Sequence, residues 1–139
     1  MPHPIAYLNF NGNCKEAMEF YEQVFGGKIT IMMSGAESPM AAMIPAESAH
    51  RIIHARLVME DGGTLYAGDC HQEQAYGGIK GVSLTMNYPT TEQATRVFNA
   101  LAEGGEIIMP MQATFWAAGW GMLTDRFGTS WGINGELSL

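Results

Sequence analysis

Leu8-Asn9-Phe10 and Met86-Asn87-Tyr88 decide the fold, because the second stretch repeats the first at a distance of 78 positions (86 − 8). The same shift superimposes Phe20 on Phe98, Gly26-Gly27 on Gly104-Gly105, and Ile29 on Ile107. The chain is therefore predicted to contain one folding unit twice. Two copies side by side usually enclose a cavity, so we expect the functional site there.

The second halves of the two copies share a turn. Asp61-Gly62-Gly63-Thr64 recurs as Asp125-Arg126-Phe127-Gly128-Thr129 with one residue inserted. Continued downstream, this alignment matches Tyr66 with Trp131, Ala67 with Gly132, and Asp69 with Asn134.

Periodicity and turn residues predict the elements of each copy. Helices are expected over Cys14–Phe25, with Asn13 as N-cap, and from Thr91 to about Glu103; the glycine pairs end both. The predicted strands are Ile5–Phe10, Lys28–Met33, Ile52–Glu60, Thr64–Asp69, Val82–Tyr88, Glu106–Met111, Gly121–Asp125 and Ser130–Leu137. The fold class is α+β: two tandem βαβββ units, about residues 4–70 and 80–137 of a single domain 1–139, whose curled mixed sheets surround a barrel-like pocket.

Composition excludes several classes of function. The net charge of −7, with only seven Lys and Arg residues, argues against nucleic-acid binding. Apolar residues occur in short runs, so no membrane span is expected, and the first residues do not read as a signal peptide. We expect a cytoplasmic protein whose two cysteines, Cys14 and Cys70, form no disulfide. Cys14 is either an inert buried thiol or, beside a helix N-cap, a thiol of lowered pKa.

Two segments break the repeat. Ser34–His50 is rich in Met, Ala and Pro and has no clear period. Gln112–Trp120 places three large aromatic residues among small ones. Each segment is predicted to be either a lid or pocket rim, or an interface.

Four blocks spread along the chain resemble the PhnB-like branch of the vicinal oxygen chelate superfamily, which includes glyoxalases, bleomycin-resistance proteins and dioxygenases. They are Tyr7–Asn13, His54–Val58, Thr114–Ala117 and Gly121–Gly128. Members of this branch are often labelled 3-demethylubiquinone methyltransferases. We do not expect that activity, because a site for S-adenosylmethionine usually has a Gly-rich turn before a helix, whereas these glycine pairs follow helices.

The resemblance implies metal ligands on the first and last strands of each unit, usually His, Gln or Glu. The positions that correspond are Ala6 or Tyr7, Leu84 or Thr85, about Ala67 and about Gly132, and none of them is His or Glu. We therefore predict no metal cofactor of the usual kind, although a divalent metal on other residues, such as Asp69, Cys70 and His71, is not excluded.

Polar and aromatic residues remain as site candidates. His54 and Asp69 are the candidate general bases, with a structural role as the alternative for each. The predicted ligand-binding residues are Tyr7, Phe10, Gln112, Trp116, Trp120 and Asn134.

Three functions fit these residues. The first is a metal-free protein that binds an unidentified small molecule. The second is an enzyme of lyase, isomerase or dioxygenase type that uses Asp69 or His54 as base. The third is a protein without a ligand that assembles through Ser34–His50. The resemblance also implies a homodimer.

Overall fold

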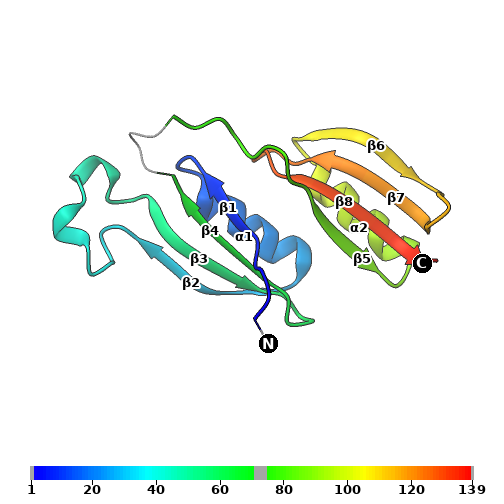
Figure 1. Ribbon diagram of the computed structural model, residues 1–139, viewed down its shortest axis with the longest axis horizontal. Coiled ribbons are helices and arrows are strands. Elements are labelled where there is room, and N and C mark those ends of the chain that lie inside the picture. The colour runs from blue at the N-terminus through cyan, green and yellow to red at the C-terminus, as the bar shows by residue number, and fades with distance from the viewer. Residues whose placement is uncertain (1, 71–74, 139) are drawn as a thin grey trace. The chain divides into compact units, whose positions relative to one another are not determined.

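The computed structural model describes residues 2–70 and 75–138. By its internal contacts the chain divides into two compact units, Met1–Gly78 and Ile79–Leu139. Each unit contains one helix and one four-stranded sheet (Figure 1). The prediction of an α+β protein built from two βαβββ units is confirmed.

In the first unit the chain runs from strand β1 through helix α1 to strands β2, β3 and β4. The bounds are Tyr7–Phe10 for β1, Cys14–Phe25 for α1, Lys28–Ser34 for β2, Ile52–Val58 for β3 and Thr64–Asp69 for β4. The order in the sheet is β1-β4-β3-β2, with β1 and β4 parallel and the other pairs antiparallel. The sheet is therefore mixed, and its first strand pairs with its last.

The second unit repeats this topology. Its elements are β5 (Leu84–Tyr88), α2 (Thr91–Ala102), β6 (Glu106–Gln112), β7 (Ala117–Thr124) and β8 (Ser130–Leu137). The order is β5-β8-β7-β6, again with the first and last strands parallel.

Each helix packs on one face of its own sheet through an apolar stripe. The buried residues of α1 are Cys14, Ala17, Met18 and Tyr21, and those of α2 are Ala94, Val97, Phe98 and Leu101. Each helix has 12 residues, and within residues 2–70 and 75–138 no helix is long and apolar enough to cross a membrane.

The helix ends follow the sequence in part. Gly26 ends α1 in the left-handed conformation, at φ 73°, and donates its N–H to the Glu22 carbonyl. Thr90 caps α2, because its side chain accepts from the Gln93 N–H. Asn13 occupies the N-cap position of α1, as predicted, but its side chain makes no capping hydrogen bond to the helix.

The two irregular segments differ from each other. Ser34–His50 contains two short 3₁₀ helices, Ala41–Met43 and Ala46–Ser48. Gln112–Trp120 is not one loop, because β6 ends at Gln112 and β7 already begins at Ala117. Strand β7 therefore starts before the predicted Gly121, and the aromatic segment is part of a hairpin.

Strand register corrects the predicted alignment of the second halves. Val58 pairs with Lys28, and Thr124 pairs with Glu106, which lies 78 positions after Lys28 (106 − 28). Val58 and Thr124 are thus equivalent, and from β3 onward the shift is 66 positions (124 − 58).

The turn before the last strand explains the error. The Met59 N–H donates to the Gly63 carbonyl over 2.7 Å, and the Asp125 N–H donates to the Thr129 carbonyl over 2.9 Å. Asp125 is therefore equivalent to Met59, not to Asp61, and the two turns have the same length.

This one-residue correction moves each match in the last strands to the other face of the sheet. Tyr7 pairs with Tyr66, and Thr85 pairs with Gly132. The corrected equivalences are Tyr66 with Gly132, Ala67 with Ile133, Gly68 with Asn134 and Asp69 with Gly135. The prediction that Asp69 and Asn134 are equivalent was therefore wrong.

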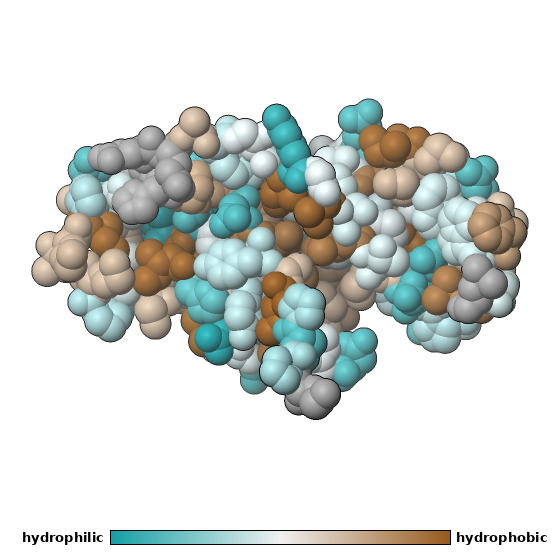
Figure 2. All heavy atoms as spheres, viewed as in Figure 1, coloured by the Kyte–Doolittle hydropathy of each residue, from teal (hydrophilic) through white to brown (hydrophobic). Residues whose placement is uncertain are grey.

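Side-chain hydropathy is mixed on the face that Figure 2 shows. Large apolar side chains are exposed in both units. Met40 and Met43 lie in the 34–50 segment, and Ile107, Ile108 and Met109 follow one another on the edge strand β6.

At Gly135, strand β8 lies close to the start of α2. A Cβ there would lie 2.7 Å from Thr91 Cα and 3.0 Å from Ala94 Cβ, whereas a Cβ at Gly132 would meet nothing nearer than 3.7 Å. We expect Gly135→Ala to lower the free energy of unfolding by about 1–3 kcal/mol, because backbone must shift. Gly132→Ala, in the same strand, is the control and should leave it nearly unchanged. Urea denaturation of both variants measures the difference; equal stabilities would contradict the tight helix–strand contact.

Candidate functional site

Alternate residues of each strand point away from the helix, and this second face of each sheet carries the candidate sites. We call these the outer faces. The outer face of the first sheet carries the side chains of Tyr7, Tyr66 and His54, since their neighbours in the strands, Leu8, Leu65 and Ala55, are buried on the helix side. The side chains of the helix face form the core of each unit, so the side chains that are open to a ligand lie on the outer face.

The first-sheet cluster consists of Tyr7, His54, Arg56 and Tyr66. The His54 ring stacks on Tyr7 with centroids 5.7 Å apart and meets the Tyr66 ring edge-on at 5.1 Å. The Arg56 Nε–H donates to His54 Nε2 over 2.8 Å, and Arg56 Cζ lies 4.8 Å from the centre of the Tyr66 ring. The predicted residues Tyr7 and His54 are thus brought together.

These contacts determine the protonation of His54. Because Nε2 accepts from Arg56, the proton of the neutral ring lies on Nδ1, which faces Tyr7 Oη at 3.3 Å. Tyr7 Oη in turn donates to the Ile53 carbonyl over 3.3 Å. Burial, and then the Arg56 charge, lower the pKa of His54. His54 is therefore neutral near pH 7, but its lone pair is already occupied, which does not favour a general base.

Asp69 lies on the helix face at the end of β4. Its Oδ1 accepts from the N–H groups of Gly12 (2.7 Å) and Cys14 (3.0 Å), and its Oδ2 accepts from the Ile52 N–H (2.8 Å). The carboxylate thus joins the start of α1 and the start of β3 to β4, in the capping role predicted for Asn13. These bonds favour the structural alternative for Asp69; its role as a base stays a prediction.

The second-sheet cluster consists of Trp116, Trp120, Asn87 and Asn134. The Trp116 and Trp120 rings meet edge-on with centroids 5.3 Å apart. Trp116 Nε1–H donates to Asn134 Oδ1 over 3.1 Å, and Asn134 Nδ2–H donates to Asn87 Oδ1 over 3.0 Å. Three predicted residues, Trp116, Trp120 and Asn134, therefore lie in one cluster.

The direction of these bonds has a chemical consequence. An indole nitrogen can only donate, so Asn134 must turn its oxygen to Trp116 and its amide nitrogen to Asn87. Asn134 is 8% exposed and has both amide ends satisfied. Asn87 is exposed, and no other described residue bonds to its Nδ2 donors. The chain of hydrogen bonds therefore ends in the Asn87 NH₂ group, which can donate a hydrogen bond to a ligand oxygen.

The remaining predicted site residues lie in different parts of the structure. Gln112 pairs with Trp120 across β6 and β7, so its side chain leaves on the same face as the second-sheet cluster. Phe10 is 0% exposed in the core, which favours packing over ligand contact. His71 lies outside the described residues.

The residues at the family's metal positions do not fit the usual ligands. On the outer faces these positions hold Tyr7, Tyr66, Thr85 and Gly132, since Ala67 lies on the helix face. Burial, and secondarily Cys14, raise the pKa of Tyr7, which disfavours a tyrosinate ligand. Within the described part of the chain no three His, Cys, Asp or Glu side chains gather closely enough to hold a metal ion. A metal-free mode of action stays a prediction.

The cysteines are both free. Burial, and then the Asp69 charge, raise the pKa of Cys14 to about 12. Cys14 is therefore a protonated, inert thiol at neutral pH, rather than one of lowered pKa. Cys70 is half-buried and contacts Arg51 Nη2 through its sulfur at 3.7 Å.

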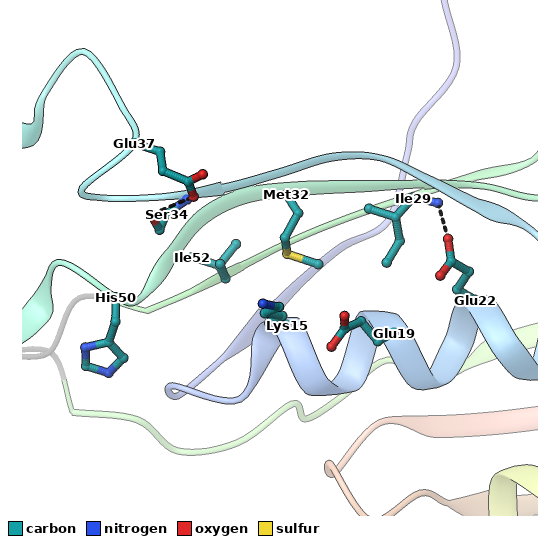
Figure 3. A pocket seen from close by; sticks show the side chains of 9 residues that line it. All are labelled: Lys15, Glu19, Glu22, Ile29, Met32, Ser34, Glu37, His50 and Ile52. Carbon is teal, nitrogen blue, oxygen red and sulfur yellow. Dashed lines mark hydrogen bonds between the residues drawn. The ribbon is translucent and has the colours of Figure 1, made fainter.

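Three cavities of the first unit have no lining residue in the first-sheet cluster. One, of about 610 Å³, opens between α1 and β2 (Figure 3). Its carboxylates Glu22 and Glu37 already accept from the Ile29 N–H and from Ser34. A second, of about 270 Å³, is lined by Met40, Met43 and Ile44 of the 34–50 segment together with Arg51 and Cys70. A third, of about 320 Å³, lies at the end of α1 beside Gly26 and Glu60.

Comparison with known proteins supports the fold and gives the family. A glyoxylase/bleomycin resistance protein/dioxygenase domain from Frankia sp. EAN1pec has the same fold, with TM-score 0.69 at 11% identity over 98% of this chain and 92% of that one. A putative 3-demethylubiquinone-9 3-methyltransferase, PhnB protein, from Bacillus cereus gives TM-score 0.79 at 24% identity over 96% and 99%. The class of fold is thus the glyoxalase/bleomycin-resistance fold that the sequence predicted.

Closer relatives agree. Residues 3–134 match the model of the 3-demethylubiquinone-9 3-methyltransferase family, and the chain belongs to that family. Protein YjdN of Escherichia coli (strain K12) is 32% identical over 136 residues, which cover 92% of this chain and 91% of that protein. Protein PA1353 from Pseudomonas aeruginosa is 46% identical, covers 98% of both chains and has TM-score 0.90.

Asp69→Asn tests the structural role of the carboxylate. An amide offers one oxygen, so its NH₂ must face at least one of the three backbone N–H donors. We expect a loss of about 1–3 kcal/mol in the free energy of unfolding, since a donor is left unsatisfied. Asp61→Asn, at an exposed turn, should change it by about 0.5 kcal/mol or less. Urea denaturation compares the two. If Asp69→Asn were as stable as wild type, the carboxylate would be free for another role.

Proposed function

We propose that the protein binds a small molecule of flat, partly apolar shape at the second-sheet cluster, without using the usual metal ligands. The observation that carries the proposal is the edge-on pair of Trp116 and Trp120 beside the Asn134–Asn87 amide chain. Indole faces supply apolar contact area, and the few polar groups fix orientation, as is typical of small-molecule sites.

The orientation of the amide groups limits which chemical groups the ligand can present. Because the chain of bonds from Trp116 ends in the Asn87 NH₂, the ligand should present an acceptor oxygen such as a carbonyl next to its flat part. Gln112 lies on the same face and can supply a second amide. We do not expect methyl transfer, since Gly26 and Gly104 lie at the C-terminal ends of the helices, where they do not form a nucleotide-binding turn.

The test is a screen of flat carbonyl compounds, with quenching of tryptophan fluorescence as the signal. For any compound that binds, Trp120→Ala should weaken binding at least tenfold, and Asn87→Ala by roughly fivefold, as expected for one lost hydrogen bond. Asn99→Ala, an exposed asparagine on α2, is the matched control and should bind as wild type does. Binding that survives both site substitutions would place the ligand elsewhere.

A homodimer is part of the same proposal. Ile107, Ile108 and Met109 are consecutive exposed apolar residues on an edge strand, which is a surface that pairing can cover. We expect sedimentation at micromolar concentration to give twice the chain mass, and Ile108→Lys to shift it toward the monomer. A monomeric wild type would contradict this part of the proposal and leave the ligand site unaffected.

A further inference from the structure

We infer that the first-sheet cluster is a separate binding site for an oxyanion, a carboxylate or phosphate group, with Arg56 as the residue that binds it. The inference does not depend on the proposed ligand of the second sheet. It rests on how the guanidinium of Arg56 is held and on what it lacks.

The guanidinium is fixed by its neighbours. Its Nε–H is bonded to His54 Nε2 at 2.8 Å, and its carbon lies 4.8 Å from the Tyr66 ring centre. His54 itself is held by Tyr7, both by stacking at 5.7 Å and through Oη at 3.3 Å from Nδ1. Rigid placement of this kind lowers the entropic cost of binding a ligand to the side chain.

The guanidinium nevertheless has no acidic partner. Arg56 is half-buried on a central strand, and no carboxylate among residues 2–70 and 75–138 forms a salt bridge with it. Its only hydrogen bond to a described residue uses Nε, which leaves the four N–H groups of Nη1 and Nη2. A half-buried cation without a counter-ion is costly, and two parallel N–H groups match the two oxygens of a carboxylate or phosphate.

The rest of the cluster favours an anion over a metal or an amine. Tyr7 carries no negative charge near pH 7, since burial raises its pKa, and none of the four side chains of the cluster is an Asp or Glu. The net charge of −7 disfavours anion binding in general, so an anion that binds does so through local contacts.

The experiment titrates the full-length protein with inorganic phosphate and, separately, with benzoate, and follows the His54 imidazole by NMR. A bound anion next to Arg56 offsets its charge, so the pKa of His54 should rise as the site fills. His54→Gln identifies the signal among the four histidines. Whichever probe binds identifies the class, phosphate or carboxylate.

Three variants decide the assignment. Arg56→Gln should weaken binding at least tenfold, and Arg56→Lys, which keeps the charge but loses the two-pronged geometry, should weaken it severalfold. Arg96→Gln, an exposed arginine on α2, should have no effect. If Arg56→Gln does not fold, the lysine variant and the His54 shift of wild type carry the test. Failure of both probes to move His54, or equal binding by Arg56→Lys and wild type, would overturn the inference.

Discussion

The parallel pairing of the first strand with the last strand is the constraint on which each unit depends. Hydrogen bonds between Tyr7–Phe10 and Tyr66–Asp69 fix which side chains face the helix and which face outward. Helix α1 connects β1 to β2 at the opposite edge of the sheet, and Asp69 ties the first turn of α1 to the end of β4 through the Gly12 and Cys14 N–H groups. Slipping β1 by one residue would turn Tyr7 toward the helix and Leu8 and Phe10 away from it.

The two units meet that constraint by different means. In the first, the Asp69 carboxylate joins β4 to the start of α1. In the second, the equivalent Gly135 lets backbone touch backbone at Thr91, and the next residue, Glu136, accepts from the Thr91 N–H over 2.9 Å. The carboxylate is displaced by one residue, yet the same kind of donor at the helix start is satisfied.

Local sequence patterns predicted the helices and strands. The predicted alignment between the two copies was wrong where identical residues are not structurally equivalent. Helix Cys14–Phe25 and strand Thr64–Asp69 have the predicted bounds, since periodicity and glycine turns determine them locally. The Asp, Gly and Thr residues shared by the two turns suggested that Asp61 is equivalent to Asp125. The backbone hydrogen bonds of the turns show instead that Met59 is equivalent to Asp125. Hydrogen bonds, unlike residue identity, define the register. Arg56 was not predicted as a site residue, because no sequence pattern signals an arginine without a counter-ion.

The outer faces of the two sheets differ at pairs of neighbouring positions. Where one position holds a larger side chain than its equivalent in the other sheet, the neighbouring position holds a smaller one. His54 and Tyr66 in the first sheet correspond to Trp120 and Gly132 in the second; a Cβ at Gly132 would lie 3.9 Å from Trp120 Nε1. A larger ring on one strand therefore goes with a missing side chain on the next.

The same rule relates Tyr7 and Gly68 to Thr85 and Asn134. A Cβ at Gly68 would lie 2.9 Å from Tyr7 Oη, so the tyrosine requires the glycine, while the smaller Thr85 leaves space for the asparagine amide. Each exchange changes the chemistry of the face while the strand pairing stays the same. The first sheet carries an arginine over a tyrosine ring and the second an indole–amide chain, so one duplicated unit presents two chemically different outer faces.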